Sequence, residues 1–168
     1  EFDAAILSVG VAGRVQGLGL EALGVTMNQG FVVVDERQQT SVPGIYAIGD
    51  VAGAPCLAHK ATHEAMIAAE TIAGHFVQGL QRDRIPGCTY SFPQIASIGL
   101  REQDAGDRAL RIGRFPLYAN GKAVVSGHTE GMIKTIFDSK TGALLGAHLI
   151  GDSVTELIQG FTVAIGLE

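Results

Sequence analysis

The stretch GIYAIGDVAGAPCLAHKATHEAMIAAE, residues 44–70, changes from an apolar run to Gly-Asp and then, through a turn of small residues, to a helical pattern. The apolar run at 45–48 predicts a buried strand that ends at Gly49 and Asp50. Ligands of open α/β sheets bind beyond the carboxyl ends of the strands, and an ionised carboxylate accepts hydrogen bonds from hydroxyl groups such as those of a sugar or ribityl chain. Asp50 is therefore a candidate ligand-binding residue, although a plain turn-capping role fits the same spacing.

A helical pattern follows the Gly-Asp pair. It runs from about His59 to Phe76, with Lys60 and Glu64 expected outside its apolar face. The N-terminus of a helix carries partial positive charge, which favours an anionic or electron-rich group nearby. Together, the carboxylate and the helix start suit an extended ligand that has hydroxyl groups at one point and gains negative charge at another. A reducible flavin has both properties.

Two further patterns in the first half predict β-structure. Residues 3–10 form a short apolar run closed by Gly10, as expected of a strand buried in a parallel sheet, and residues 31–35 form a second β-rich run. The sequence Val-Pro-Gly at 42–44 predicts a turn, since Pro presets a negative φ and Gly accepts a positive one. The charged stretch 82–87 ends in Pro-Gly and is the best candidate for a domain boundary.

The second half has an antiparallel pattern. Two β-rich runs, 132–137 and 144–150, flank the loop 138–142 and predict a hairpin. Ser153 and Glu156 match a capping box, which satisfies the backbone N–H groups at a helix start. An apolar stripe follows at helical spacing, made of Val154, Leu157, Ile158, Phe161 and Ile165. The chain ends while this pattern is still running, so we expect its C-terminus to be a truncation.

Composition excludes several classes of function. The 17 acidic residues exceed the 12 Lys and Arg residues, and the net charge of -5 leaves no basic stripe for nucleic acid. The apolar runs are shorter than the roughly 20 residues that span a bilayer, so we expect a soluble protein with no membrane partner. Cys56 and Cys88 are too far apart for a C-x-x-C motif. His59 and His63 have the i, i+4 spacing of a zinc pair, but no third ligand accompanies them and no metal site is predicted.

Four stretches carry a resemblance to a known family. They are TSVPGIYAIGDVAGAPCLAHKATHEAMIAAE, LSVGVAGRVQGLGLEALGV, IPGCTYSFPQIASIGL and GALLGAHLIGDSVTELIQGF, and together they cover most of the chain. Taken in their order along the chain, they resemble the C-terminal part of the pyridine nucleotide-disulfide oxidoreductases. The Leu-Ala-His-Lys and Gly-Ala-His-Leu-Ile-Gly runs resemble the branch that oxidises dihydrolipoamide more than they resemble glutathione or mercuric reductases.

The resemblance implies a fold class and a domain organisation. The expected fold is an α/β remnant of an FAD domain followed by an α+β interface domain with an antiparallel sheet and helices. Residues 1–10 would be the last strand of the NAD-binding domain, and residues 11–84 the C-terminal part of the FAD-binding domain. Residues 85–168 would be the interface, or dimerisation, domain, truncated at its C-terminus.

The resemblance also implies cofactor-binding residues. Asp50 would bind the ribityl and pyrophosphate region of FAD, the segment from Cys56 to His59 would line the flavin, and Gly10 would approach NAD. Cys56 replaces a Met that is usual in the family, and this departure should alter packing more than chemistry. The complete predicted set is Gly10, Gly49, Asp50, Cys56, Leu57, Ala58 and His59, with the backbone of Ala58 as the favoured flavin contact.

The implied activity is reoxidation of dihydrolipoamide with NAD, through a redox disulfide and FAD. The family's redox disulfide would lie upstream of Glu1 and its His-Glu pair beyond Glu168, so no catalytic residue is named and the isolated chain is expected to be inactive. A homodimer is expected, with Phe92-Pro93-Gln94 and the helix 153–165 as interface candidates. Components of a 2-oxo acid dehydrogenase complex are the expected partners, in the cytoplasm or, in a eukaryote, the mitochondrial matrix.

Two alternatives remain open from the sequence. One is a stand-alone dimerisation or interaction module that has lost catalysis. The other is part of a sister flavoprotein disulfide reductase of the glutathione or mercuric reductase type.

Overall fold

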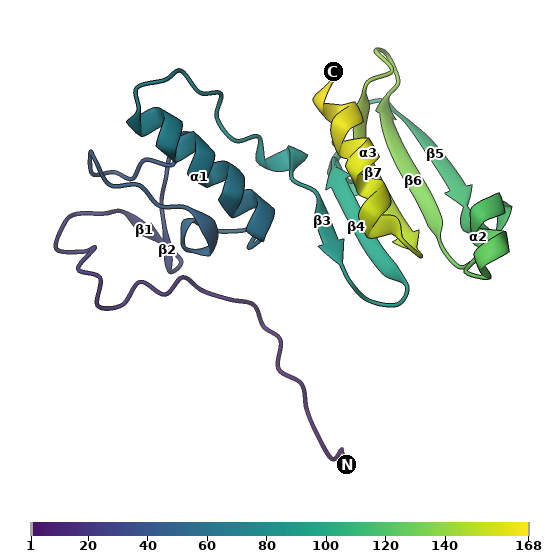
Figure 1. Cartoon of the computed structure of the whole chain (residues 1–168), viewed down its shortest axis with the longest axis horizontal. Coiled ribbons are helices and arrows are strands. Elements are labelled where there is room, and N and C mark those ends of the chain that lie inside the picture. Colours follow the sequence, from purple (N-terminus) through teal and green to yellow (C-terminus); the bar gives the residue numbers. More distant parts are fainter. Residues whose placement is uncertain (1, 168) are drawn as a thin grey trace. The chain divides into compact units, whose positions relative to one another are not determined.

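The structure is a computed structural model that describes residues 2–167 (Figure 1). The chain divides into two compact units, one that ends at Leu80 and one that begins at Gln81. This division lies next to the charged stretch 82–87. Within the described part of the chain, no helix has both the length and the apolar character that a bilayer crossing requires.

The first unit has little regular β-structure. Its two short strands, β1 (Met27–Asn28) and β2 (Phe31–Val32), pair antiparallel. The apolar side chains of this part gather in one small cluster around the buried residues Val15, Val25 and Val32. Of the predicted β-rich run 31–35, only the first two residues, which form β2, belong to a strand.

The predicted strand at 3–10 is not formed. Ile6 is 97% exposed and Leu7 is 84% exposed, and no described strand pairs with this segment. A strand needs neighbours that satisfy its backbone N–H and C=O groups, and a periodic apolar pattern supplies no neighbour by itself.

The predicted strand at 45–48 is formed only in part. Its backbone bonds an adjacent extended segment, with Ala47 N donating to Gln38 O at 3.1 Å and Thr40 N donating to Ile45 O at 2.9 Å. Only Tyr46 forms a β-bridge, to Gln39. The predicted turn at 42–44 is confirmed, since Ile45 N donates to Val42 O across it.

Helix α1 (Ala58–Ile72) follows the 3-10 turn η1 (Gly49–Ala52). The helix starts one residue before the predicted position and ends earlier, which leaves Phe76 90% exposed. The prediction that Lys60 and Glu64 lie away from the buried face is wrong. They are fully buried, together with Ile67 and Ala68, because positions i, i+4, i+7 and i+8 share one face of a helix.

The second unit contains one five-stranded antiparallel sheet in the order β3-β4-β7-β6-β5 (Figure 1). The strands are β3 (Gly87–Thr89), β4 (Gln94–Gly99), β5 (Leu110–Pro116), β6 (Met132–Asp138) and β7 (Leu144–Gly151). The helices are α2 (Gly121–Ser126) and α3 (Val154–Gly166), and the 3-10 turns are η2 (Arg82–Arg84), η3 (Glu102–Asp104) and η4 (Leu117–Ala119).

The predicted hairpin is confirmed as β6 and β7. Its loop is built by Asp138, whose Oδ1 accepts hydrogen bonds from Lys140 N at 2.8 Å and Thr141 N at 2.9 Å. Gly142 then takes a φ of 80°, a left-handed conformation that glycine adopts without steric cost. The same side-chain and glycine chemistry is visible in the sequence, which is why this element could be predicted.

Helix α3 covers one face of the sheet by packing on β4 and β7 (Figure 1). Val154, Ile158 and Ile165 from the predicted apolar stripe are buried in this core, whereas Leu157 is 49% exposed. The partners that these side chains meet on the sheet include Ala96, Ile98, Ala147 and Leu149.

The predicted capping box at the start of α3 is wrong. Ser153 has a φ of 58° and makes no capping hydrogen bond, and its hydroxyl donates to Asp152 instead. The carbonyl oxygen of the Gln94 side chain, on β4, accepts hydrogen bonds from Thr155 N at 3.2 Å and Thr155 Oγ1 at 2.8 Å. A tertiary contact thus satisfies the helix start that a local box was expected to satisfy.

Candidate functional site

The predicted ligand-binding residues Gly49 and Asp50 begin η1, directly after the extended segment. The Asp50 residue is exposed, and within residues 2–167 no hydrogen bond reaches its carboxylate. Its backbone carbonyl closes the turn by accepting from Gly53 N at 3.1 Å. A side-chain capping role is therefore absent, and the carboxylate is open to groups outside the chain.

The start of α1 lies against this turn. The Cβ of Ala61 would be 3.5 Å from a Cβ placed on Gly49, so the first helical turn packs directly on the buried Gly49 backbone. The helix has Leu57 at its N-cap position, without a side-chain cap. The structure thus places the turn that carries Asp50 against the first residues of α1.

The segment predicted to line a flavin differs in exposure along its length. Cys56 and Leu57 are partly buried, whereas Ala58 and His59, the first residues of α1, are exposed. Gly10 does not join this group: it lies in the exposed segment 3–10, and a Cβ added to it would meet nothing within 4 Å.

A buried ion pair on α1 binds the backbone of the Gly49-Asp50 turn. Lys60 Nζ lies 3.1 Å from Glu64 Oε1, and both side chains are 0% exposed. Glu64 Oε2 accepts a hydrogen bond from Gly49 N at 2.7 Å, and Lys60 Nζ donates to Gly49 O at 3.0 Å. Two side chains of α1 therefore bind both polar groups of the residue that precedes Asp50.

Sequence reasoning missed Lys60 and Glu64 as site residues. Their opposite charges at i, i+4 resemble the surface pairs that support exposed helices. The signal that could have found them is their position on the same stripe as Ile67 and Ala68, in the first two turns of the helix that follows a Gly-Asp pair.

The two cysteines, Cys56 and Cys88, are both free thiols in the structure. Burial, with a smaller contribution from the Glu156 charge, raises the pKa of the Cys88 thiol. A raised pKa keeps Cys88 protonated and makes it a weak nucleophile at neutral pH.

No metal-binding arrangement is found at the histidines. Within residues 2–167, no group of three or more His, Cys, Asp or Glu side chains is placed to hold a metal ion. His128 and His148 are predicted from the sequence to be strand residues rather than catalysts. His148 does lie on β7, and its Nε2 is 2.9 Å from Leu100 O. The prediction is wrong for His128, which follows α2 in the loop that leads to β6.

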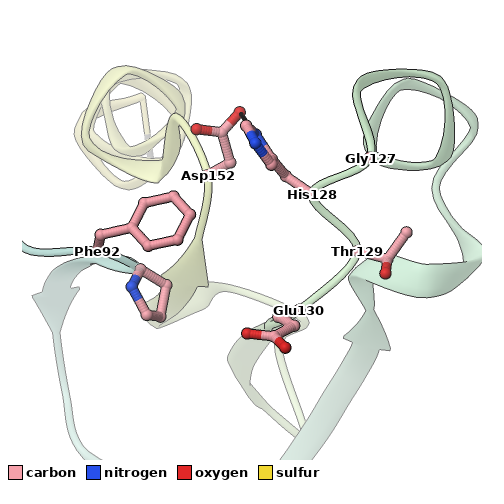
Figure 2. Close-up of a pocket in the computed structure, with 7 residues that line it drawn as sticks. Phe92, Gly127, His128, Thr129, Glu130 and Asp152 are labelled. Carbon is pink, nitrogen blue, oxygen red and sulfur yellow. Dashed lines mark ion pairs between the residues drawn. The ribbon is translucent and has the colours of Figure 1, made fainter.

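The second unit contains a pocket with a volume of about 280 Å³ (Figure 2). His128 and Asp152 point toward each other at its rim, with Nδ1 3.3 Å from Oδ2. The ring of Phe92 packs edge-on against His128 at 5.8 Å between centroids. This His-Asp pair fastens the loop after α2 to the junction between β7 and α3. The full lining is Phe92, Pro93, Gly127, His128, Thr129, Glu130 and Asp152.

The His128-Asp152 pair should make the stability of the second unit depend on pH in the acidic range. The hydrogen bond from His128, helped by the Ser153 hydroxyl, holds the pKa of Asp152 below its usual value. A depressed folded-state pKa contributes stability above the unfolded pKa of about 3.9, and this contribution is lost as the pH falls through the folded value. We expect Asp152→Asn to be less stable than the wild type at pH 7, with the difference shrinking as the pH falls below about 4 toward the lowered pKa of Asp152.

Urea denaturation at several pH values between 3 and 7 measures this difference. Asp107→Asn changes another exposed aspartate of the same unit and should follow the wild type at every pH. A constant difference between Asp152→Asn and the wild type across the whole range would contradict the assignment.

Comparison with family models decides the relationship of the chain. Residues 85–168 match the pyridine nucleotide-disulphide oxidoreductase dimerisation domain, and residues 1–65 match the pyridine nucleotide-disulphide oxidoreductase model. The chain belongs to the pyridine nucleotide-disulphide oxidoreductases. The fold class expected from the sequence, an FAD-domain remnant followed by an α+β dimerisation domain, is confirmed.

The chain is similar to two curated dihydrolipoyl dehydrogenases. It is 53% identical to the one from Zymomonas mobilis over 99% of this chain and 36% of that protein, and 56% identical to the one from Rhizobium etli over 99% of this chain and 35% of that protein. The predicted resemblance to the lipoamide branch is confirmed. The chain spans about a third of the length of these relatives.

The chain is also similar to solved structures. LpdA from Mycobacterium tuberculosis matches with a TM-score of 0.88 and 30% identity, over 95% of this chain and 35% of that one. The HOCl-induced flavoprotein disulfide reductase RclA from Escherichia coli matches with a TM-score of 0.85 and 26% identity, over 94% of this chain and 37% of that one.

Proposed function

We propose that the chain is part of an FAD-dependent dihydrolipoyl dehydrogenase, to which it contributes one side of the flavin site and the dimerisation surface. The observation that carries the proposal is the identity of more than half of the residues, over 99% of the chain, with two dihydrolipoyl dehydrogenases. In the complete enzyme, dihydrolipoamide would be oxidised through a redox disulfide and FAD, with NAD as the acceptor. The chain alone would be inactive, because its two cysteines, Cys56 and Cys88, do not have the C-x-x-x-x-C spacing of the family's redox disulfide.

The geometry of the first unit fits an FAD. The exposed Asp50 carboxylate can accept hydrogen bonds from ribityl hydroxyl groups, and it has no competing partner among the described residues. The adjacent start of α1, at Ala58, favours a group that becomes electron-rich, which is the property that a flavin supplies when it is reduced. Cys56, Leu57 and His59 would line that end of the cofactor.

The remaining assignments extend this proposal. Residues 1–10 would belong to the NAD-binding domain, with Gly10 beside NAD, residues 11–84 to the FAD-binding domain, and residues 85–168 to the dimerisation domain. The match of the last segment to the dimerisation-domain model supports a homodimer. Components of a 2-oxo acid dehydrogenase complex would be the partners, in the cytoplasm or in the mitochondrial matrix of a eukaryote.

Replacing Asp50 tests the flavin site. In the complete protein we expect Asp50→Asn to raise the FAD dissociation constant about tenfold or more, because hydrogen bonds to a charged acceptor contribute about 1.5–3 kcal/mol. Titration of the apoprotein with FAD, followed by quenching of flavin fluorescence, gives the constant. Asp107→Asn is the matched control, since Asp107 is an exposed aspartate of the other unit.

Three results of this titration have different meanings. A selective loss in Asp50→Asn supports the proposal. If the wild type and both variants bind FAD with equal affinity, Asp50 does not contribute to the site, although the protein is still a flavoprotein. A complete protein that binds no FAD would overturn the flavoenzyme proposal and would favour the stand-alone dimerisation module.

A further inference from the structure

The first unit holds two charged side chains that the proposed chemistry does not use. Lys60 is 1% exposed and Glu64 is 0% exposed. Removing two charges from water is costly, and an apolar pair of similar volume is often as stable or more stable. The presence of this pair is therefore poorly explained by stability alone, and its contacts indicate another role.

Those contacts converge on a single residue. Gly49 N donates to Glu64 Oε2 at 2.7 Å, and Gly49 O accepts from Lys60 Nζ at 3.0 Å. Lys60 Nζ also lies 3.1 Å from Glu64 Oε2, so the ion pair and the two polar groups of Gly49 form a closed ring. Hydrogen bonds with a charged partner are shorter and stronger than neutral ones, which makes this ring a stiff attachment.

The ring adds charged hydrogen bonds between two parts that the loop 53–57 connects in the chain. On one side is Gly49, which has a φ of 75° and immediately precedes Asp50. On the other side are the first two turns of α1, which carry Lys60 and Glu64. The direction in which the backbone enters Asp50 is thereby fixed relative to the N-terminus of α1.

We propose that Lys60 and Glu64 are positioning residues, which hold the Asp50 carboxylate at a fixed place relative to the start of α1 so that both meet one extended cofactor. The inference rests on the proposed FAD site and assigns to the pair a role in cofactor affinity that is separate from its role in folding. Neither side chain touches the cofactor, since both are buried beneath the turn.

A double substitution separates the two roles. Lys60→Met with Glu64→Leu removes both charges together at similar volume, so the unfolding temperature of the complete apoprotein should fall less than in Lys60→Met alone. The loss that remains comes from the N–H and C=O groups of Gly49, which the double variant leaves without these partners. We expect the FAD dissociation constant to rise about tenfold, the loss that corresponds to one charge-assisted hydrogen bond. The amide hydrogen of Gly49, freed from Glu64, should exchange with solvent at least about tenfold faster.

The control applies the same chemical changes to exposed positions. Lys122→Met with Glu70→Leu alters one exposed residue of α2 and one of α1, and should leave FAD affinity and Gly49 exchange unchanged. Glu64→Gln is a second test variant, which keeps an oxygen acceptor for Gly49 N. Its FAD affinity and Gly49 exchange rate should lie between those of the wild type and the double variant.

The outcomes distinguish this inference from the proposed function. A double variant that folds and binds FAD as tightly as the wild type would overturn the positioning role and leave the flavoenzyme proposal standing. If the double variant does not fold, equal affinity of Glu64→Gln and Glu70→Gln would overturn it. A wild-type protein that binds no FAD would overturn the proposed function, and the inference with it.

Discussion

Gly146→Ala is expected to lower the free energy of unfolding of the second unit by about 3 kcal/mol or more. Gly146 lies in β7, and a Cβ placed on it would be 2.2 Å from Leu100 O and 2.9 Å from Leu100 N. Both atoms belong to the backbone of Leu100. The same Leu100 N donates a hydrogen bond to Leu145 O. The clash cannot be relieved by a side-chain rotation, so part of the sheet would have to move.

Chemical denaturation followed by far-UV circular dichroism measures this effect. Gly160→Ala is the matched control, because Gly160 lies within α3 and a Cβ placed on it would meet nothing within 4 Å. Alanine is favoured over glycine in a helix by about 1 kcal/mol, so this control should gain stability. Similar denaturation midpoints for the two variants would show that the Leu100 backbone beside Gly146 leaves room for a Cβ.

Lys60→Met as a single substitution is expected to lower the free energy of unfolding by about 3–5 kcal/mol. It leaves the Glu64 carboxylate fully buried without the ammonium group that lies 3.1 Å away in the wild type, and it removes the donor to Gly49 O. Breaking one partner of a buried pair is more costly than replacing both. The single variant should therefore be less stable than the double variant that also carries Glu64→Leu.

Thermal unfolding of the complete apoprotein compares the three forms. Lys122→Met is the control, since Lys122 is exposed and surface substitutions usually change stability by less than about 0.5 kcal/mol. If Lys60→Met had the same unfolding temperature as this control, the Lys60-Glu64 pair would not contribute to stability. Other contacts would then have to hold Gly49 in place.

Elements that depend on nearby residues could be predicted from the sequence. The β6-β7 hairpin follows from two alternating runs and from the Asp138 and Gly142 chemistry between them. The start of α1 follows from the change of pattern after the small-residue turn. The proximity of Asp50 to that helix start follows from the short connection between the two elements.

Elements that depend on distant residues could not be predicted. The apolar run at 3–10 has the composition of a buried strand, but strand formation requires a neighbour and none of the described strands supplies one. Ser153 and Glu156 have the spacing of a capping box, but the hydrogen bonds at that helix start go to a strand. Lys60 and Glu64 have the composition of a solvated helix face, and only the fold shows that Gly49 is their partner.

The side chain of Gln94 has a consequence for the order in which the second unit folds. The 13-residue α3 receives its N-terminal cap from a residue that precedes Thr155 by 61 positions. Isolated helices of this length are only marginally stable in water. As the chain leaves the ribosome, β4 is made first, and α3 gains its cap only when it docks on the assembled sheet. Closure of this long loop, rather than nucleation of the helix, would then limit the rate at which the unit reaches its native state.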